Sequence, residues 1–204
     1  MKLILGTKVA MSQIFDADGV VHPVTVISAG PVTVTQLKTN ESDGYQAVQV
    51  GFGTRNEKNI SKAVKGHLKG LGNFRFLREF PLVKGAEMKI GDKIDVSAFA
   101  EGDVVTVSGV SKGKGFQGVV KRHGFHGGPR SHGQKHSERE PGSIGGGLRT
   151  GPRKGMRMGG RMGGDRVTVK NLKVVQIDSA KNEIFISGAI PGRRGTLVEI
   201  TSIK

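Results

Sequence analysis

Most of the chain alternates apolar and polar side chains with the two-residue period of β-strands, and turn residues interrupt the alternation at short intervals. Residues 3–11 and 13–15 lead through the turn Asp16-Ala17-Asp18-Gly19 into residues 20–28, which predicts a β-hairpin. Pro23 predicts that the second strand is an edge or bulged strand, because proline has no N–H for the ladder. Further strands are expected at residues 31–37, 45–52, 93–99, 104–110, 167–178, 183–187 and 196–203. These short strands predict a mainly β fold, a closed or nearly closed antiparallel barrel or a sandwich.

Residues 56–80 follow a different period. Lys58, Lys62, Lys65 and Lys69 recur at helical spacing beside the apolar residues Ile60, Ala63, Val64 and Leu68. This pattern predicts a small helical insert, formed by a short helix or a helix pair. Its basic face is either a solvated surface or a contributor to anion binding, and the pattern fits both.

The alternation stops in residues 112–166. This window holds 17 of the 33 glycines and four of the six histidines, and between Lys121 and Ser143 its only apolar side chain is Phe125. Such a segment cannot bury enough apolar surface to offset the entropy lost on ordering. We therefore expect residues 1–111 and 167–204 to form one β-barrel body, and residues 112–166 to form a long irregular extension, rich in Gly, Arg and Lys, that is inserted into it. The extension is either disordered or ordered by a partner.

Charge concentrates in the same window. The 204 residues include 32 Lys plus Arg and 17 Asp plus Glu, a formal net charge of +15. Residues 112–166 contain 13 basic and three acidic residues and so carry +10 of that charge. This predicts a polyanionic partner, although charge alone does not separate nucleic acid from an anionic membrane surface.

Several protein classes are excluded by composition. No apolar run approaches the ~20 residues that cross a membrane, and Thr7 and Lys8 interrupt the first apolar stretch, so no signal peptide is expected. Because the chain has no cysteine, a disulfide scaffold, a Cys-ligated metal site and a thiol nucleophile are ruled out. A protein bound to a membrane surface would need an amphipathic helix with a strong apolar face, which the basic window lacks.

Two motifs in the window suggest enzymes. Residues Gly113 to Gly118 match G-x-G-x-x-G, and Glu138 lies at the distance of a ribose-binding acid, but residues 121–137 supply neither a crossover helix nor a second parallel strand. Ser131 and Ser137 lie near histidines, without the context of a nucleophile elbow. A dinucleotide-dependent enzyme and a DNA-compacting protein remain as rival hypotheses, although nothing resembles a groove-reading helix.

The histidines and methionines of the window allow two interpretations each. His123, His126, His132 and His136 have a spacing that could hold a metal, but their basic neighbours oppose a cation. Rings and guanidinium groups interleaved with glycine suit RNA better, because they stack on unpaired bases and meet phosphates. Met156, Met158 and Met162 alternate with Gly and Arg, either in a flexible low-complexity segment or in a strand that faces RNA. We expect no metal, cofactor or small-molecule substrate.

The segment most specific to one family is Ser111-Lys-Gly-Lys-Gly-Phe-Gln-Gly-Val-Val-Lys-Arg-His-Gly-Phe125. It is followed by Gly127-Gly-Pro129, Ser131-His-Gly133, His136 and Pro141-Gly-Ser-Ile-Gly145. Together these closely resemble the signature of the universal L-three family of large-subunit ribosomal proteins, in its bacterial form. The resemblance extends over the chain, with further matches at residues 6–15, 43–50, 77–80, 167–175 and 188–192.

This resemblance implies a structural, non-enzymatic constituent of the large ribosomal subunit in the cytoplasm. It would bind 23S rRNA directly near the 3′ end of that RNA, nucleate early assembly and contact neighbouring ribosomal proteins. The extension tip would approach the peptidyl transferase centre through Pro141, Gly142, Ser143, Ile144, Gly145, Gly146, Gly147, Leu148 and Arg149. Many bacterial members have a methylated Gln where this chain has Gly146, so that modification is not expected, and residues 149–153 also depart from the family pattern.

The residues expected to contact rRNA are the basic, aromatic and amide side chains of the extension. They are Lys112, Lys114, Phe116, Gln117, Lys121, Arg122, His123, Phe125, His126, Arg130, His132, Lys135, His136, Arg139, Arg149, Arg153, Lys154, Arg157, Arg161 and Arg166.

Overall fold

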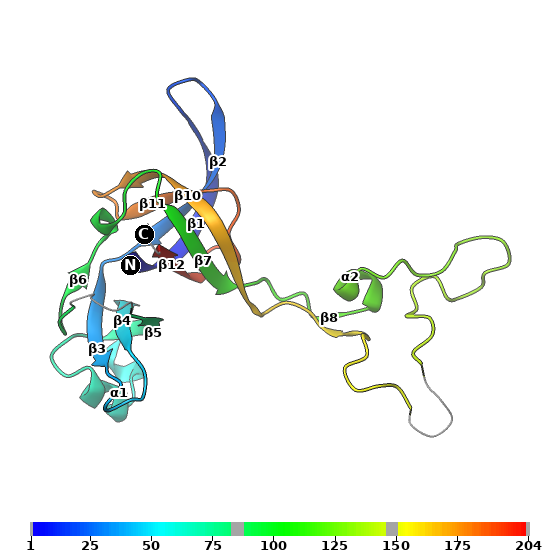
Figure 1. Ribbon diagram of the computed structural model, residues 1–204, viewed down its shortest axis with the longest axis horizontal. Helices are drawn as coiled ribbons and strands as arrows, with labels where there is room; N and C mark the ends of the chain where they lie inside the picture. Colours follow the sequence, from blue (N-terminus) through cyan, green and yellow to red (C-terminus); the bar gives the residue numbers. More distant parts are fainter. Residues whose placement is uncertain (1, 83–87, 146–150, 203–204) are drawn as a thin grey trace. The chain divides into compact units, whose positions relative to one another are not determined.

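A computed structural model describes residues 2–82, 88–145 and 151–202 (Figure 1). Its strands are β1 (Lys2–Phe15), β2 (Val21–Ala29), β3 (Val32–Lys38), β4 (Ala47–Thr54), β5 (Phe74–Pro81), β6 (Lys93–Ile94), β7 (Val104–Val110), β8 (Phe116–Gln117), β9 (Gly160–Arg161), β10 (Arg166–Asp178), β11 (Glu183–Ser187) and β12 (Leu197–Ser202). Its helices are α1 (Lys62–His67), α2 (Val119–His123) and the single 3₁₀ turns η1 (Glu57–Asn59) and η2 (Val96–Ala98). The chain divides into two compact units, residues 1–110 with 166–204, and residues 111–165.

The first unit is built on a closed antiparallel barrel with the strand order β1-β12-β7-β10-β11-β2. The predicted hairpin is confirmed, since β1 pairs with β2 as far as Phe15↔Val21. Pro23 pairs with Gln13 of β1, but the pairing of β2 with β11 begins only at Val24. The prediction of an edge or bulged strand is wrong, because β2 pairs with both β1 and β11 and the bulge lies between Lys8 and Ala10 of β1. The proline fits because it lies just before the first pair with β11, where no ladder N–H is needed.

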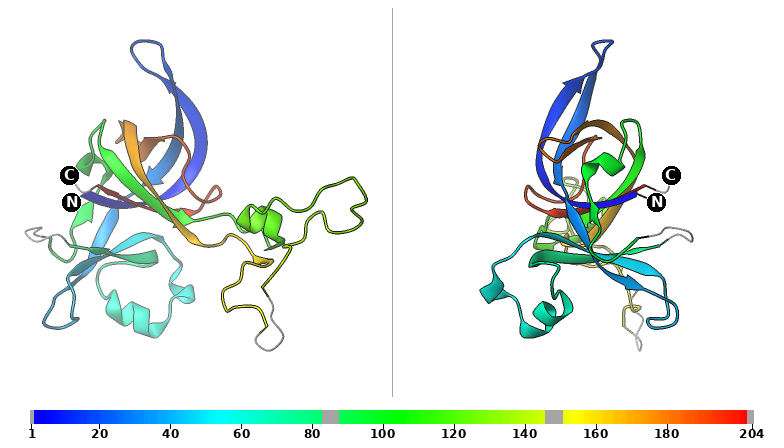
Figure 2. Two further views of the ribbon diagram at one scale, coloured as in Figure 1. Left: turned by 45° about the vertical axis from the view of Figure 1, so that its right-hand side comes forward. Right: turned by 90° about the vertical axis from the view of Figure 1, so that its left-hand side faces the viewer.

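A smaller sheet with the order β5-β4-β3-β6 completes this unit (Figure 2). It shares one apolar core with the barrel, so that the two sheets stabilise each other. The fully buried members of this core include Leu3, Ile4, Ile27, Val34, Val48, Val50, Val107, Ile184 and Ile200.

The helical insert is shorter than the sequence pattern predicts. Helix α1 is confirmed and begins after Ser61, whose Oγ accepts a hydrogen bond from the Val64 N–H at 3.4 Å. Residues 74–81, however, form β5, and the helical prediction for residues 74–80 is wrong. Phe76 and Phe80 lie opposite Phe52 and Val48 of β4, because aromatic side chains at alternate positions favour a half-buried strand.

The strand predicted at residues 93–99 is also shorter, because only Lys93–Ile94 pair. Val96 and Phe99 are both buried, at 1% and 5% exposure. The 3₁₀ turn η2 places residues three apart on the same side, whereas a strand would point them to opposite faces.

The second unit is inserted in the sequence between β7 and β10. These two strands pair directly with each other, and Val110↔Arg166 is the last pair before the insertion. No helix in the described ranges has the length and apolar composition needed to cross a bilayer.

Candidate nucleic-acid interface

The base of the second unit is a narrow antiparallel ribbon formed by residues 111–117 and 160–165. The Ser111 N–H donates to the Asp165 carbonyl at 2.9 Å, Lys114 N–H to Met162 at 2.9 Å, and Met162 N–H to Gly115 at 3.0 Å. Strands β8 and β9 extend this ribbon through Phe116↔Arg161 and Gln117↔Gly160. The backbone thus satisfies much of its own hydrogen bonding and leaves the side chains to face outward.

Gly163 is required where the two halves of the ribbon come closest. Its φ is +76°, and a Cβ at this position would overlap the carbonyl oxygen of Lys112. A residue with a side chain would have to push the two segments apart. At this position, a glycine of the window allows the backbones of the two ribbon segments to approach closely.

Helix α2 ties the ribbon to the returning chain. Val119 is 3% exposed and anchors the helix. Arg122 donates from Nη1 to the Met158 carbonyl oxygen at 2.8 Å, and His123 Nε2 lies 3.1 Å from the same oxygen. One carbonyl therefore positions two predicted RNA-contacting side chains side by side.

An open groove of about 620 Å³, which we call the basic groove, lies between the ribbon and α2. It is lined by Ser111, Lys112, Lys114, Arg122, His123, Arg161, Met162, Gly163 and Asp165. Within the described residues, Lys112, Lys114 and Arg161 have no carboxylate within ion-pair distance. Four permanent positive charges thus face a groove that contains a single carboxylate, an arrangement whose charge is complementary to phosphate groups.

A second hollow of about 710 Å³ shares His123 with the basic groove. Its lining includes Phe125, His126, Gln134 and Arg157, and the His123 and Phe125 ring centres are 6.0 Å apart and tilted by 46°. Ring faces, an amide and a guanidinium in one hollow can stack on bases and hydrogen-bond to their edges.

Residues 127–138 form a loop that is closed at its neck. The Gly128 N–H donates to the Glu138 carbonyl at 3.0 Å, and a Cβ at Gly127 would overlap that same oxygen. Arg130 Nε lies 3.6 Å from the Glu138 carboxylate, but both side chains are largely exposed. The loop therefore presents its charges to solvent.

Metal and dinucleotide chemistry find no geometric support in this unit. No three His, Asp or Glu side chains in the described ranges come together as a metal site. The G-x-G-x-x-G segment does not form a strand–turn–helix unit of a dinucleotide-binding fold, because Phe116 and Gln117 belong to β8 within the ribbon.

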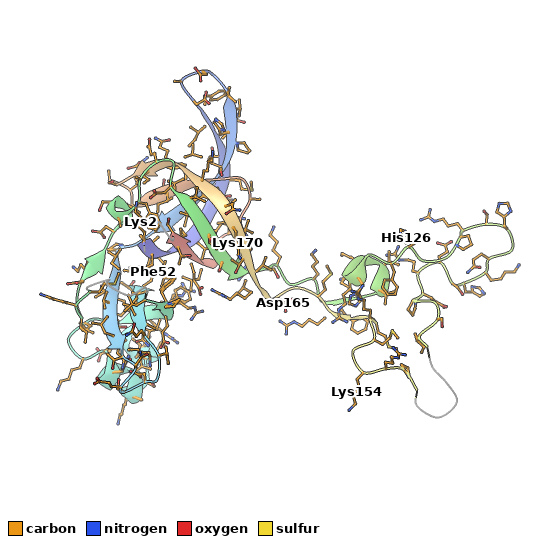
Figure 3. The ribbon with its side chains drawn as sticks, in the orientation of Figure 1. Lys2, Phe52, His126, Lys154, Asp165 and Lys170 are labelled. Atoms are coloured by element: carbon orange, nitrogen blue, oxygen red, sulfur yellow. The ribbon has the colours of Figure 1, made fainter. Side chains whose placement is uncertain are left out.

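Most of the predicted contact residues lie in this unit with exposed side chains, as the labelled His126 and Lys154 illustrate (Figure 3). Gln117, His123 and Phe125 are half-buried. Arg166 lies in the other unit, where its guanidinium binds Glu199. Arg149 lies outside the described residues, as do Gly146, Gly147 and Leu148 of the predicted tip.

Sequence reasoning missed several residues that line the basic groove. Ser111, Gly163 and Asp165 were not predicted as contacts, and Met162 was expected only as part of a possible RNA-facing strand. They line the groove because the ribbon pairs residues 111–115 with residues 162–165. The sequence signal that could have predicted this pairing is the set of glycines on both segments, Gly113, Gly115, Gly163 and Gly164, because glycine allows two backbones to approach closely.

Comparisons with known proteins agree with the motifs. A family model described as ribosomal protein L3 matches residues 83–189. The large ribosomal subunit protein uL3 of Herpetosiphon aurantiacus is 50% identical over 200 residues, which cover 97% of this chain and 94% of that protein. The proteins of the same name from Dehalococcoides mccartyi and Finegoldia magna are 48% and 45% identical over 198 and 202 residues, and they cover 97% and 98% of this chain and 96% and 97% of their own.

The match therefore extends over both units, including the ribbon and its groove. The resemblance carried by residues 111–145 is confirmed, and the chain belongs to the ribosomal protein L3 family in its bacterial form.

Proposed function

We propose that this protein is a structural constituent of the large ribosomal subunit and binds 23S rRNA directly through residues 111–165. The observation that carries this proposal is the basic groove, in which Lys112, Lys114, Arg122 and Arg161 gather beside His123 with one carboxylate nearby. Cationic groups that have no carboxylate partner among the described residues can neutralise phosphates and release counterions when RNA binds. Because this unit has few apolar side chains of its own to bury, RNA would supply the packing partner it lacks.

Membership of the family supports several finer parts of this proposal. The protein binds near the 3′ end of the rRNA, acts early in subunit assembly in the cytoplasm, and contacts neighbouring ribosomal proteins. The segment Pro141 to Gly145, together with the residues up to 149 that the structure does not describe, approaches the peptidyl transferase centre and supports it. No residue is assigned a catalytic role.

The test is a triple variant of the basic groove, Lys112→Gln, Lys114→Gln and Arg161→Gln. Affinity for transcribed large-subunit rRNA is measured by filter binding, with Lys170→Gln, Lys181→Gln and Arg193→Gln on the body as a charge-matched control. We expect the groove variant to lose roughly tenfold or more in affinity and the slope of log K against log salt to become shallower by about 2. Equal losses in the two variants would show that the groove has no special role.

A further inference from the structure

A second basic hollow lies in the unit that contains the barrel. It is formed at the connection between β4 and β5, whose backbone is drawn in cyan to green in Figure 2. It is an open cleft of about 460 Å³, which we call the insert cleft, lined by Thr54, Arg55, Asn56, Asn59, Arg75 and Phe76. Thr54 ends β4, Asn56 precedes the 3₁₀ turn η1 and Asn59 is its last residue. Arg75 and Phe76 lie in β5. Two guanidinium groups therefore face one hollow that no acidic residue lines.

The polar side chains of Arg55, Asn56 and Asn59 have no partner among the described residues. Asn56 precedes η1, yet its side chain makes no capping hydrogen bond. Within the part of the chain that the structure describes, the side chains of Arg55, Asn56 and Asn59 take part in no hydrogen bond or ion pair. These donors remain available to a ligand.

Arg75 is held in place by packing. Its guanidinium lies 5.0 Å from the centre of the Phe76 ring, and a guanidinium over an aromatic face keeps its N–H edge free for further hydrogen bonds. Gly53 lies between the paired positions Phe52↔Phe76 and Thr54↔Phe74, so no side chain across the ladder covers Arg75.

Other charged residues near the insert cleft form ion pairs within the protein. Arg78, on the same strand as Arg75, has its Nε 3.1 Å from Glu199. Glu57, in η1, accepts a hydrogen bond from Lys65 Nζ at 2.9 Å. The surrounding carboxylates thus have their own partners, and the two arginines of the insert cleft keep their full charge.

We propose that the insert cleft binds the sugar-phosphate backbone of RNA, as a second rRNA contact that is separate in sequence from residues 111–165. Guanidinium forks match phosphate oxygens in pairs, while the Asn amides and the Thr54 hydroxyl match phosphate and 2′-hydroxyl groups. The side chains of Arg55, Asn56, Asn59 and Arg75 are all exposed, which suits a continuous strand better than an enclosed small anion. This inference rests on the proposed function, since it concerns the same RNA partner.

The experiment compares three full-length variants with the wild type on transcribed rRNA that contains the 3′-terminal domain. Arg55→Gln/Arg75→Gln removes the cleft cations, and Asn56→Asp/Asn59→Asp adds repulsion while it leaves the arginines in place. Lys170→Gln/Lys181→Gln on the barrel unit is the control with an equal change in net charge. Circular dichroism and thermal melting verify that all variants fold, as expected for exposed side chains.

We expect both cleft variants to lose about tenfold in affinity relative to the control and the Arg55/Arg75 variant to lower the salt slope by 1 to 2. Hydroxyl-radical footprinting should show one protected RNA patch lost in the cleft variants and retained in the triple variant of the basic groove.

If the cleft variants have the same affinity, salt slope and footprint as the control, the insert cleft is not an RNA site. The proposed function would still stand in that case. Failure of the wild type to bind rRNA would overturn both. Since the assay contains only RNA and this protein, a cleft that serves an acidic protein segment instead would give the unchanged result.

Discussion

At the scale of single residues, Gly163 shows most directly how sequence serves the candidate site. The ribbon that supports the basic groove brings its two backbones together at this glycine, and no larger residue fits without displacing the Lys112 carbonyl. The sequence alone shows a glycine-rich window and predicts a segment that is either disordered or ordered by a partner. Which glycines are structural becomes visible only when the pairing partner, about fifty residues away, is known.

Gly163→Ala should therefore weaken rRNA binding. The strain of a left-handed alanine, about 1–2 kcal/mol, is added to the steric overlap with Lys112 and opens the ribbon. The matched control is Gly133→Ala, which also has a positive φ, of +84°, but has open space around the Cβ position. Amide exchange at residues 111–117 should accelerate in the first variant alone, and equal exchange in both would contradict the role given to Gly163.

The pH dependence of stability offers a second residue-scale prediction. The hydrogen bond from Lys2 Nζ at 2.6 Å, with a further one from the Ala100 N–H at 2.9 Å, lowers the pKa of Asp103 below its usual value of about 3.9. A lowered folded-state pKa means that the carboxylate stabilises the fold above about pH 4, and that this contribution is lost as pH falls further.

The melting temperature of Asp103→Asn should accordingly fall less between pH 5 and pH 3 than that of the wild type. Asp18→Asn, at an exposed carboxylate outside any ion pair in the described residues, should follow the wild-type curve. If Asp103→Asn also follows the wild-type curve, the pair of Asp103 with Lys2 makes no measurable contribution to the pH dependence of stability.

At the scale of elements, the strands were predictable and the insert was not. Residues 104–110 and 183–187 were predicted with the bounds that β7 and β11 have, because their alternation is local. Residues 74–80 were misassigned to a helix, since the lysine period of residues 58–69 was extended past its end. The aromatic residues of β5 gain their stability from β4, a partner distant in sequence that periodicity does not reveal.

Phe80→Ala tests this correction. Phe80 is 3% exposed and pairs with Val48, so its truncation should destabilise the protein by about 3–5 kcal/mol in urea unfolding. Phe15→Ala, at 61% exposure, should change stability by no more than about 0.5 kcal/mol. A small effect of Phe80→Ala would argue against its place in the core.

At the scale of the whole molecule, the barrel does not depend on the inserted unit. β7 and β10 pair from Val110↔Arg166 onward, so replacing residues 112–165 by a short Gly/Ser linker should leave the barrel closed. The uneven distribution of charged and apolar residues along the sequence predicted a β-barrel body with a separate, inserted basic extension. The basic groove itself could not be predicted, because it arises from backbone pairing between residues 111–117 and 160–165.

The linker variant should unfold cooperatively, with near-native circular dichroism in the β region. Its large-subunit assembly should be defective, because the main RNA-contacting surface is gone. Unimpaired assembly in a reconstitution assay would mean that residues 112–165 are dispensable.

The central claim is that residues 111–165 supply most of the electrostatic contact with rRNA, and its most direct test is the salt dependence of binding. If about half of the 13 basic residues in 112–166 meet phosphates, log K of the full chain should fall with log salt at a slope near −4 or steeper. The linker variant should bind more weakly with a slope of roughly −2 or shallower, since only contacts of the body remain. Equal slopes for the two proteins, or an affinity of the full chain that is independent of salt, would contradict the account.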